Sequence, residues 1–132
     1  MKVSQFEELD EARCELLHPI TGKPLGAAVR LCGPNSAKRK AIIADRARRI
    51  RRQVEKTGKL RLDDPEVEFD NNVAMLAACT LGWEGIDDDD GQPLPFSVGA
   101  AEQLYHGADW LRQQVQAAFD DKELFIKDLS HA

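Results

Sequence analysis

The stretch that governs the interpretation of this chain is VAMLAACTLGWEGIDDDDGQPLPF, residues 73–96. Its first nine residues are apolar on nearly every side, which is typical of a helix buried in a core or under another chain. Trp83 follows between two glycines, and four consecutive aspartates, Asp87–Asp90, lead into Pro-Leu-Pro-Phe. Because glycine and an acidic run do not continue a helix, the stretch predicts a buried helix over about 65–81 that gives way to an acidic loop.

The size and composition of the chain predict one globular domain. It has 132 residues, of which 42% are hydrophobic and 31% charged, a balance typical of a protein with its own core. We expect an N-terminal arm over 1–13 and a single globular domain over 14–132. No apolar run approaches the ~18 residues of a membrane span, and the N-terminus is too acidic for a signal peptide. The sequence therefore predicts a cytoplasmic protein with no membrane partner.

The three cysteines, Cys14, Cys32 and Cys79, lie far apart and form no CxxC pair. An odd number of separated cysteines suits a reducing compartment. We interpret them as small apolar side chains with free thiols.

The net charge of −5 conceals a strong segregation of charge. Residues 37–61 carry eleven Lys and Arg against two acids, a net charge of +9. Residues 62–132 carry three Lys and Arg against sixteen acids, a net charge of −13. Opposite blocks of this size favour pairing, either within the chain or head-to-tail between copies in a homo-oligomer.

The first half of the chain predicts a β-hairpin followed by a basic helix. Residues 14–32 contain two strand-like segments around a Gly- and Pro-containing turn. The helix is expected over about 36–56, capped by Asn35 or Ser36 and ended by Gly58. Its apolar positions form one narrow stripe, made of Ile43, Ala47, Ile50 and Val54.

The second half predicts further helices and completes the fold class. Asp64 followed by Pro65 is a strong helix start, and Ser97 is a good cap for another helix. We expect helices over about 65–81, 97–106, 108–120 and 121–129. The predicted fold class is α+β, mostly α-helical with four to five helices and an N-terminal β-hairpin.

Residues with catalytic or metal-binding chemistry form no recognisable pattern. A calcium loop with Gly91 at its sixth position would need oxygen ligands at its first and twelfth positions, which Ile86 and Ser97 do not supply in the required form. There is no phosphate-binding loop, no nucleophile elbow and no metal-type spacing of His and Cys. We therefore predict a non-enzymatic protein without a metal or cofactor.

The basic helix leaves two alternatives open. Its arginines could neutralise phosphates, or they could pair with acids in self-association: Arg46, Arg48, Arg49, Arg51 and Arg52. Between Gly33 and Gly58 there is no aromatic residue to stack on a base, and the sequence pI of about 5.2 is acidic. A solvated or acid-paired face is favoured over nucleic acid, and a small nucleic-acid-binding regulator using 37–56 is the alternative function.

Three short segments carry a family resemblance: Leu-Gly-Trp-Glu-Gly at 81–85, Pro-Leu-Pro-Phe-Ser at 93–97 and Trp-Leu-Arg-Gln-Gln-Val at 110–115. In this order, after a helix of small apolar residues, they resemble the tail assembly chaperones of long, flexible-tailed bacteriophages and their prophages. The segment 17–26, followed by Gly33-Pro34, fits the N-terminal hairpin of such proteins. The resemblance covers about residues 14–126.

The resemblance implies a non-enzymatic role in the cytoplasm of the bacterial host. Such chaperones bind the helical tape measure protein, keep it soluble and help to recruit tail tube subunits. For this chain we expect a partner groove between the apolar helix ending at Leu81 and the helix that holds Trp110. The predicted partner-binding residues are Val73, Leu76, Ala77, Leu81, Trp83, Trp110 and Leu111.

Overall fold

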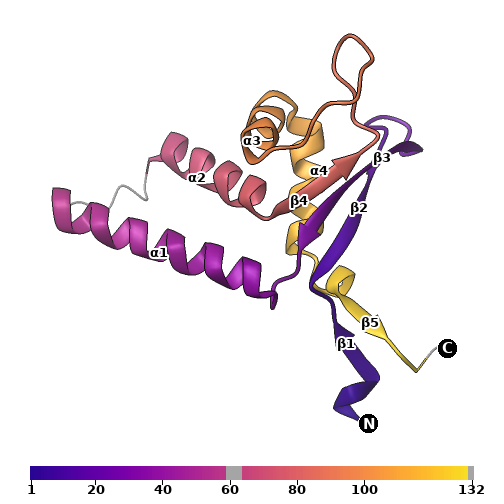
Figure 1. Cartoon of the computed structure of the whole chain (residues 1–132), viewed down its shortest axis with the longest axis horizontal. Helices are drawn as coiled ribbons and strands as arrows, with labels where there is room; N and C mark the ends of the chain where they lie inside the picture. Colours follow the sequence, from indigo (N-terminus) through magenta and orange to yellow (C-terminus); the bar gives the residue numbers. More distant parts are fainter. Residues whose placement is uncertain (59–63, 131–132) are drawn as a thin grey trace.

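A three-stranded antiparallel sheet, in the order β2–β3–β4, is the centre of the computed structural model, which describes residues 1–58 and 64–130 (Figure 1). Strand β2 (Glu11–Leu17) pairs with β3 (Pro24–Cys32), and β3 pairs with β4 (Thr80–Glu84). The turn between β2 and β3 is closed by the hydrogen bond from the His18 N–H to the Lys23 carbonyl, 2.8 Å long. The predicted N-terminal hairpin is therefore confirmed.

Strand β4 corrects the prediction that the buried helix continues to residue 81. Helix α2 (Pro65–Ala78) ends at Ala78, and the next residues pair with β3, with Trp83 opposite Val29. Gly82 lies in this strand rather than in a turn, and a Cβ there would lie 2.5 Å from the Arg30 guanidinium. Tertiary hydrogen bonding to β3 thus overrides the local pattern, since strand formation depends on what lies beside the strand.

Four α-helices are present in the described residues, and their starts follow the predicted caps. They are α1 (Ala37–Thr57), α2, α3 (Val98–Gly107) and α4 (Asp109–Asp120). The side chains of Ser36, Asp64 and Ser97 each accept a hydrogen bond from a backbone N–H in the first turn of a helix. These helices, together with the two sheets, give the predicted α+β class.

The two ends of the chain form a second, small sheet that the sequence did not predict. Strand β1 (Phe6–Glu8), after the 3₁₀ turn η1 (Val3–Gln5), pairs antiparallel with β5 (Ile126–Asp128). The expected arm over 1–13 therefore contains strand residues, and β2 already begins at Glu11.

The expected helix over 121–129 is wrong. This segment instead forms the 3₁₀ helix η2 (Lys122–Phe125) followed by strand β5, because η2 buries Phe125 and β5 pairs with β1.

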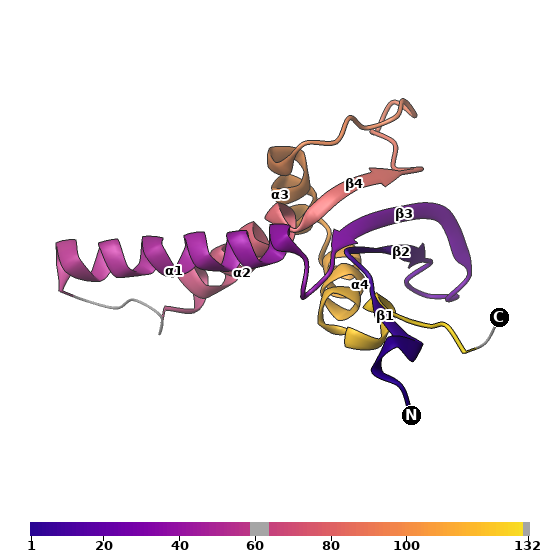
Figure 2. The ribbon, with the colours of Figure 1, turned by 60° about the horizontal axis from the view of Figure 1, so that its bottom comes forward.

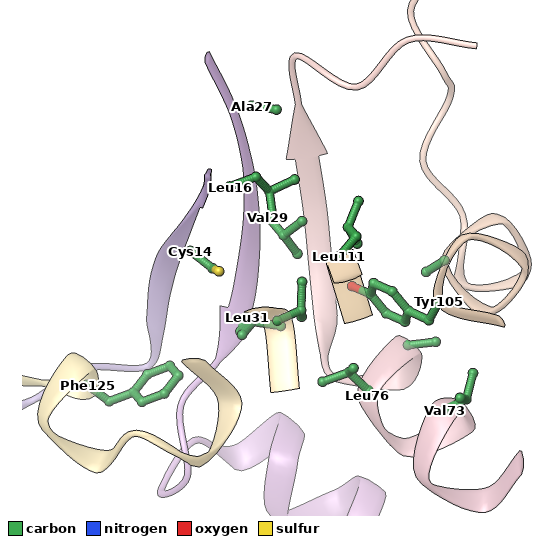
Figure 3. Packing of buried hydrophobic residues seen from close by; sticks show 13 residues of the cluster. Cys14, Leu16, Ala27, Val29, Leu31, Val73, Leu76, Tyr105, Leu111 and Phe125 are labelled. Atoms are coloured by element: carbon green, nitrogen blue, oxygen red, sulfur yellow. The ribbon is translucent and has the colours of Figure 1, made fainter. Parts of the chain in front are cut away.

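The core lies between one face of the β2–β3–β4 sheet and helices α2, α3 and α4 (Figure 3). The Tyr105 hydroxyl donates to the Thr80 hydroxyl at 2.7 Å, and Thr80 in turn donates to the Leu76 carbonyl at 2.8 Å. Burial raises the pKa of Tyr105 to about 12. The buried cluster consists of Cys14, Leu16, Ala27, Val29, Leu31, Val73, Leu76, Ala77, Ala101, Tyr105, Leu111, Val115 and Phe125.

The aspartate run is part of an ordered turn. The Asp88 carboxylate accepts hydrogen bonds from the N–H groups of Asp90 and Gln92, both at 2.9 Å. At the start of this loop Gly85 has φ +72°, and a Cβ on it would lie 2.3 Å from the Gly26 carbonyl oxygen. Glycine is required there by conformation and by space. The Asp87–Asp90 side chains are exposed, as the sequence predicted.

Candidate functional site

Helix α1 leaves the body of the protein instead of packing on it. Of its side chains only Arg39 is buried, and both views show α1 and α2 extending away from the sheet (Figures 1 and 2). The predicted apolar stripe is correspondingly uncovered, with Ile43 51% and Val54 37% exposed. A single helix that buries almost none of its surface presents most of it to solvent or to a partner.

The first turn of α1 is fixed to the body by two residues. The Ser36 hydroxyl donates to the Gly33 carbonyl at 2.6 Å and accepts from the Arg39 N–H at 3.1 Å. The Arg39 guanidinium donates to the carbonyls of Cys32 and Phe119 and lies 4.0 Å from the centroid of the Phe119 ring. These contacts attach the base of α1 to the body of the protein, whereas the rest of the helix has few neighbours.

A groove of about 510 Å³ lies between α1 and α2, which run in opposite directions (Figure 1). We call it the α1–α2 groove. Its apolar lining comes from both helices: Ala41, Ile42 and Ile50 of α1, and Ala74, Met75 and Ala78 of α2. Its polar lining consists of Lys38, Asp45, Arg46, Arg49, Gln53 and Asn71. The groove is thus apolar in part and mainly cationic among its charged side chains.

The positive charge of α1 is poorly compensated. Asp45 lies 3.0 Å from Arg49 and 3.9 Å from Arg48. In the described part of the chain, no carboxylate forms an ion pair with Arg46, Arg51 or Arg52. Two acids of the second half form ion pairs away from α1, Glu84 with Arg13 and Asp109 with Arg112, and the Asp70 carboxylate lies 3.8 Å from the His106 Nε2. The expected pairing of the two charge blocks within the chain is therefore absent from the described residues, and pairing between copies stays a prediction.

Four of the seven predicted partner-binding residues belong to the core. Val73, Leu76, Ala77 and Leu111 are buried against the sheet and neighbouring helices. The α1–α2 groove uses another face of α2, formed by Asn71, Ala74, Met75 and Ala78. In the sequence this face differs little from the buried one, since alanines occur on both.

The other three predicted residues are more accessible. Leu81 is half-buried and Trp110 is 38% exposed. The Trp83 indole N–H donates to the Leu94 carbonyl at 2.8 Å, and its ring meets Phe96 edge-on at 4.9 Å. Trp83 therefore holds the acidic loop against the core, and a partner-binding role for these three residues stays a prediction.

Cys32 and Cys79 lie at the junction where α1 and α2 leave the sheet. The Cys32 N–H donates to the Cys79 carbonyl at 2.9 Å, and both residues are buried. The neighbouring Cys79 thiol, together with Arg39, lowers the pKa of Cys32 to about 6 against the effect of burial. The cysteines in the structure are free, as predicted.

In the described residues, no cluster of three or more His, Cys, Asp or Glu is arranged to hold a metal ion. None of the described helices combines the length and the apolar character needed to cross a membrane.

Comparison with known proteins indicates a phage-related origin. A sequence model of the YdaY prophage protein family matches residues 38–128, from the first turn of α1 to the last residue of β5. The match includes both helices of the groove and spans well over half of the chain. The chain therefore belongs to the YdaY prophage protein family. No curated protein and no solved structure matches it.

Proposed function

We propose that this prophage protein is a non-enzymatic tail assembly chaperone. It would bind helical segments of the tape measure protein in the cytoplasm of the host and help to recruit tail tube subunits. Membership of a prophage family supports the setting, and the resemblance of residues 81–85, 93–97 and 110–115 to tail assembly chaperones supports the role.

The observation that carries the proposal is the unpartnered surface of α1 and α2. A helix of 21 residues is about 31 Å long, and most of the residues of α1 are exposed. Exposed apolar side chains in a contiguous groove mark an interaction site more often than a free surface. A chaperone for a long helical protein needs such a surface, because it prevents aggregation by covering the apolar surface of its client without modifying it.

Co-expression with the tape measure protein of the same prophage tests this function. We expect the tape measure protein to shift from the insoluble to the soluble fraction and to elute with this chain on size exclusion. Added tail tube protein should then bind to this complex or displace this chain from the tape measure protein. The proposal fails if the tape measure protein stays insoluble and no complex elutes.

A nucleic-acid-binding regulator is the competing function for the same basic helix. It would bind DNA or RNA with an affinity that falls steeply with salt. The described residues that line the α1–α2 groove include no aromatic side chain on which a base could stack. We therefore favour a protein client, and absence of DNA and RNA binding at low salt would reject the regulator.

A further inference from the structure

We propose that the α1–α2 groove is the docking site for one amphipathic helix whose apolar stripe is flanked by Asp and Glu. The inference rests on the proposed function only in taking the client to be a helical protein. It adds where the client binds and which charge its helix must carry.

The shape of the groove suits a helix. Helix α2, one wall of the groove, has 14 residues, a length of about 21 Å or four turns. Ala41, Ala74 and Ala78 line the groove, and small side chains let a third helix approach closely. Ile42 and Met75 are half-buried and supply apolar contact, and methionine adapts to partners of different shape. A client helix of about four turns would complete a three-helix arrangement.

The positive charge of the groove favours acidic residues on both sides of the apolar stripe of the client helix. Among the described residues, Lys38, Arg46 and Arg49 line it together with one acid, Asp45, which already lies 3.0 Å from Arg49. Asp or Glu beside the client's apolar stripe would meet these cations, whereas Lys or Arg there would be repelled. Complementary charge at an interface selects the partner and speeds association more than it adds affinity.

A second copy of this chain fits the groove less well. Helices α2, α3 and α4 each bury their main apolar face in the core: Val73, Leu76, Ala77, Ala101, Tyr105, Leu111 and Val115. The large apolar side chains that these helices expose, Phe69, Val98 and Trp110, are one to a helix. The acids of α2 are in its first turns, at Glu66, Glu68 and Asp70, rather than beside a free apolar stripe. A partner protein with an acidic amphipathic helix is the occupant that the observations favour.

Two fluorescein-labelled peptides test the charge requirement on the full chain. Both carry the same Leu/Ile stripe in about five helical turns, one with Glu and the other with Lys at the flanking positions. In fluorescence anisotropy the Glu peptide should bind saturably, and the Lys peptide should bind at least about tenfold more weakly. Added salt should reduce the difference in affinity between the two peptides. Equal binding of the two peptides would overturn the charge requirement.

Matched variants test the location. Ala74→Trp fills the groove, and Ala47→Trp makes the same change at an exposed α1 position outside the groove lining. We expect about a tenfold loss of Glu-peptide affinity for Ala74→Trp and little change for Ala47→Trp, with unchanged far-UV circular dichroism for both. Equal effects of the two variants would overturn the assignment of the groove.

A second pair of variants distinguishes binding in the groove from non-specific attraction to the positive charge of α1. Arg46→Glu/Arg49→Glu reverses the charge of the groove lining, and Arg51→Glu/Arg52→Glu makes the same change of net charge outside it. The first pair should weaken the Glu peptide at least about fivefold more than the second. Equal losses would show a non-specific polyanion surface of the kind that binds nucleic acid, and would refute the docking site.

The remaining outcomes distinguish this inference from the proposed function. If the tape measure complex forms equally well with Ala74→Trp, the groove assignment is wrong while the chaperone function stands. If the Glu peptide binds in the groove but no tape measure complex forms, the function is wrong and the site stands. A dimer that Ala74→Trp dissociates, with no peptide binding, would make a second copy the occupant and overturn the inference.

Discussion

Replacement of Arg39 by methionine tests whether this one side chain anchors α1. Arg39 is 5% exposed, its guanidinium donates to the carbonyls of Cys32 and Phe119, and it lies over the Phe119 ring. Methionine keeps much of the length and apolar packing but removes the charge and the planar donors. The substitution therefore isolates the polar part of the anchor.

The expected loss of stability follows from these contacts. Hydrogen bonds from a charged donor contribute about 1.5–3 kcal/mol, and a desolvated cation–π contact contributes up to about 2 kcal/mol. Against this, the Arg39 Nε has no hydrogen-bond partner among the described residues, and its removal relieves a burial cost of about 1–3 kcal/mol. The free energy of unfolding should fall by about 2 kcal/mol.

Urea unfolding followed by circular dichroism measures this loss. Arg39→Lys should recover little of it, because an ammonium group cannot reproduce two fixed donors and ring stacking. Lys40→Met is the control, since Lys40 is exposed beside Arg39, and its effect should stay within about 0.5 kcal/mol. Arg39→Met with the stability of the unmodified chain would refute the anchor.

The remaining predictions concern the acidic loop and the core. Gly85→Ala should lower the free energy of unfolding by well over the roughly 1–2 kcal/mol of a positive φ alone, since its Cβ would lie 2.3 Å from the Gly26 carbonyl oxygen. Gly91→Ala, with φ +80° and no described atom within 4 Å, should lower it by about 1–2 kcal/mol. Equal melting temperatures of the two variants would contradict the close approach at Gly85. The raised pKa of Tyr105, about 12, means that the folded state keeps the phenol neutral while the unfolded state ionises near pH 10. The contribution of Tyr105 to the free energy of unfolding is therefore fully present below about pH 10 and is lost, by roughly 2–3 kcal/mol, as the pH rises to about 12. The Tyr105→Phe variant should not show this loss. Parallel pH profiles of the free energy of unfolding for the variant and the unmodified chain would contradict the prediction.

The parts of the fold that the sequence could predict have local signals. Ser36, Asp64 and Ser97 are helix caps because of what each side chain does within three residues of itself, so the helix starts were found to within one residue. The hairpin was found because its turn and alternation lie within one short segment. These features need no knowledge of distant residues.

The parts that could not be predicted depend on distant partners. Strand β4 exists because β3 lies beside it, about fifty residues earlier in the chain, and β1 pairs with β5 from the other end. In both cases the local sequence favoured another structure. The sequence predicts that Gly82 ends a helix, whereas in the strand its lack of a side chain leaves room for Arg30.

The candidate site was only half predictable for a related reason. The basic helix and its arginines were evident in the sequence, but periodicity does not say whether an apolar stripe is covered. The predicted stripe contained Ile43 and Val54, which are exposed, and only its Ile50 lines the groove, beside Ile42. On α2 the buried and groove-lining faces are both apolar, so only the packed structure separates Leu76 from Met75.

Hydrogen exchange on the complex with the tape measure protein is the most direct test of the central claim, that α1 and α2 form the client-binding surface. We expect binding to slow exchange along α1 between about residues 41 and 53 and on the groove face of α2, because docking should suppress the local opening of poorly supported helices. Exchange in the β2–β3 turn should not change. Protection confined to the sheet or to α3 and α4, with α1 exchanging as fast as in the free chain, would contradict it.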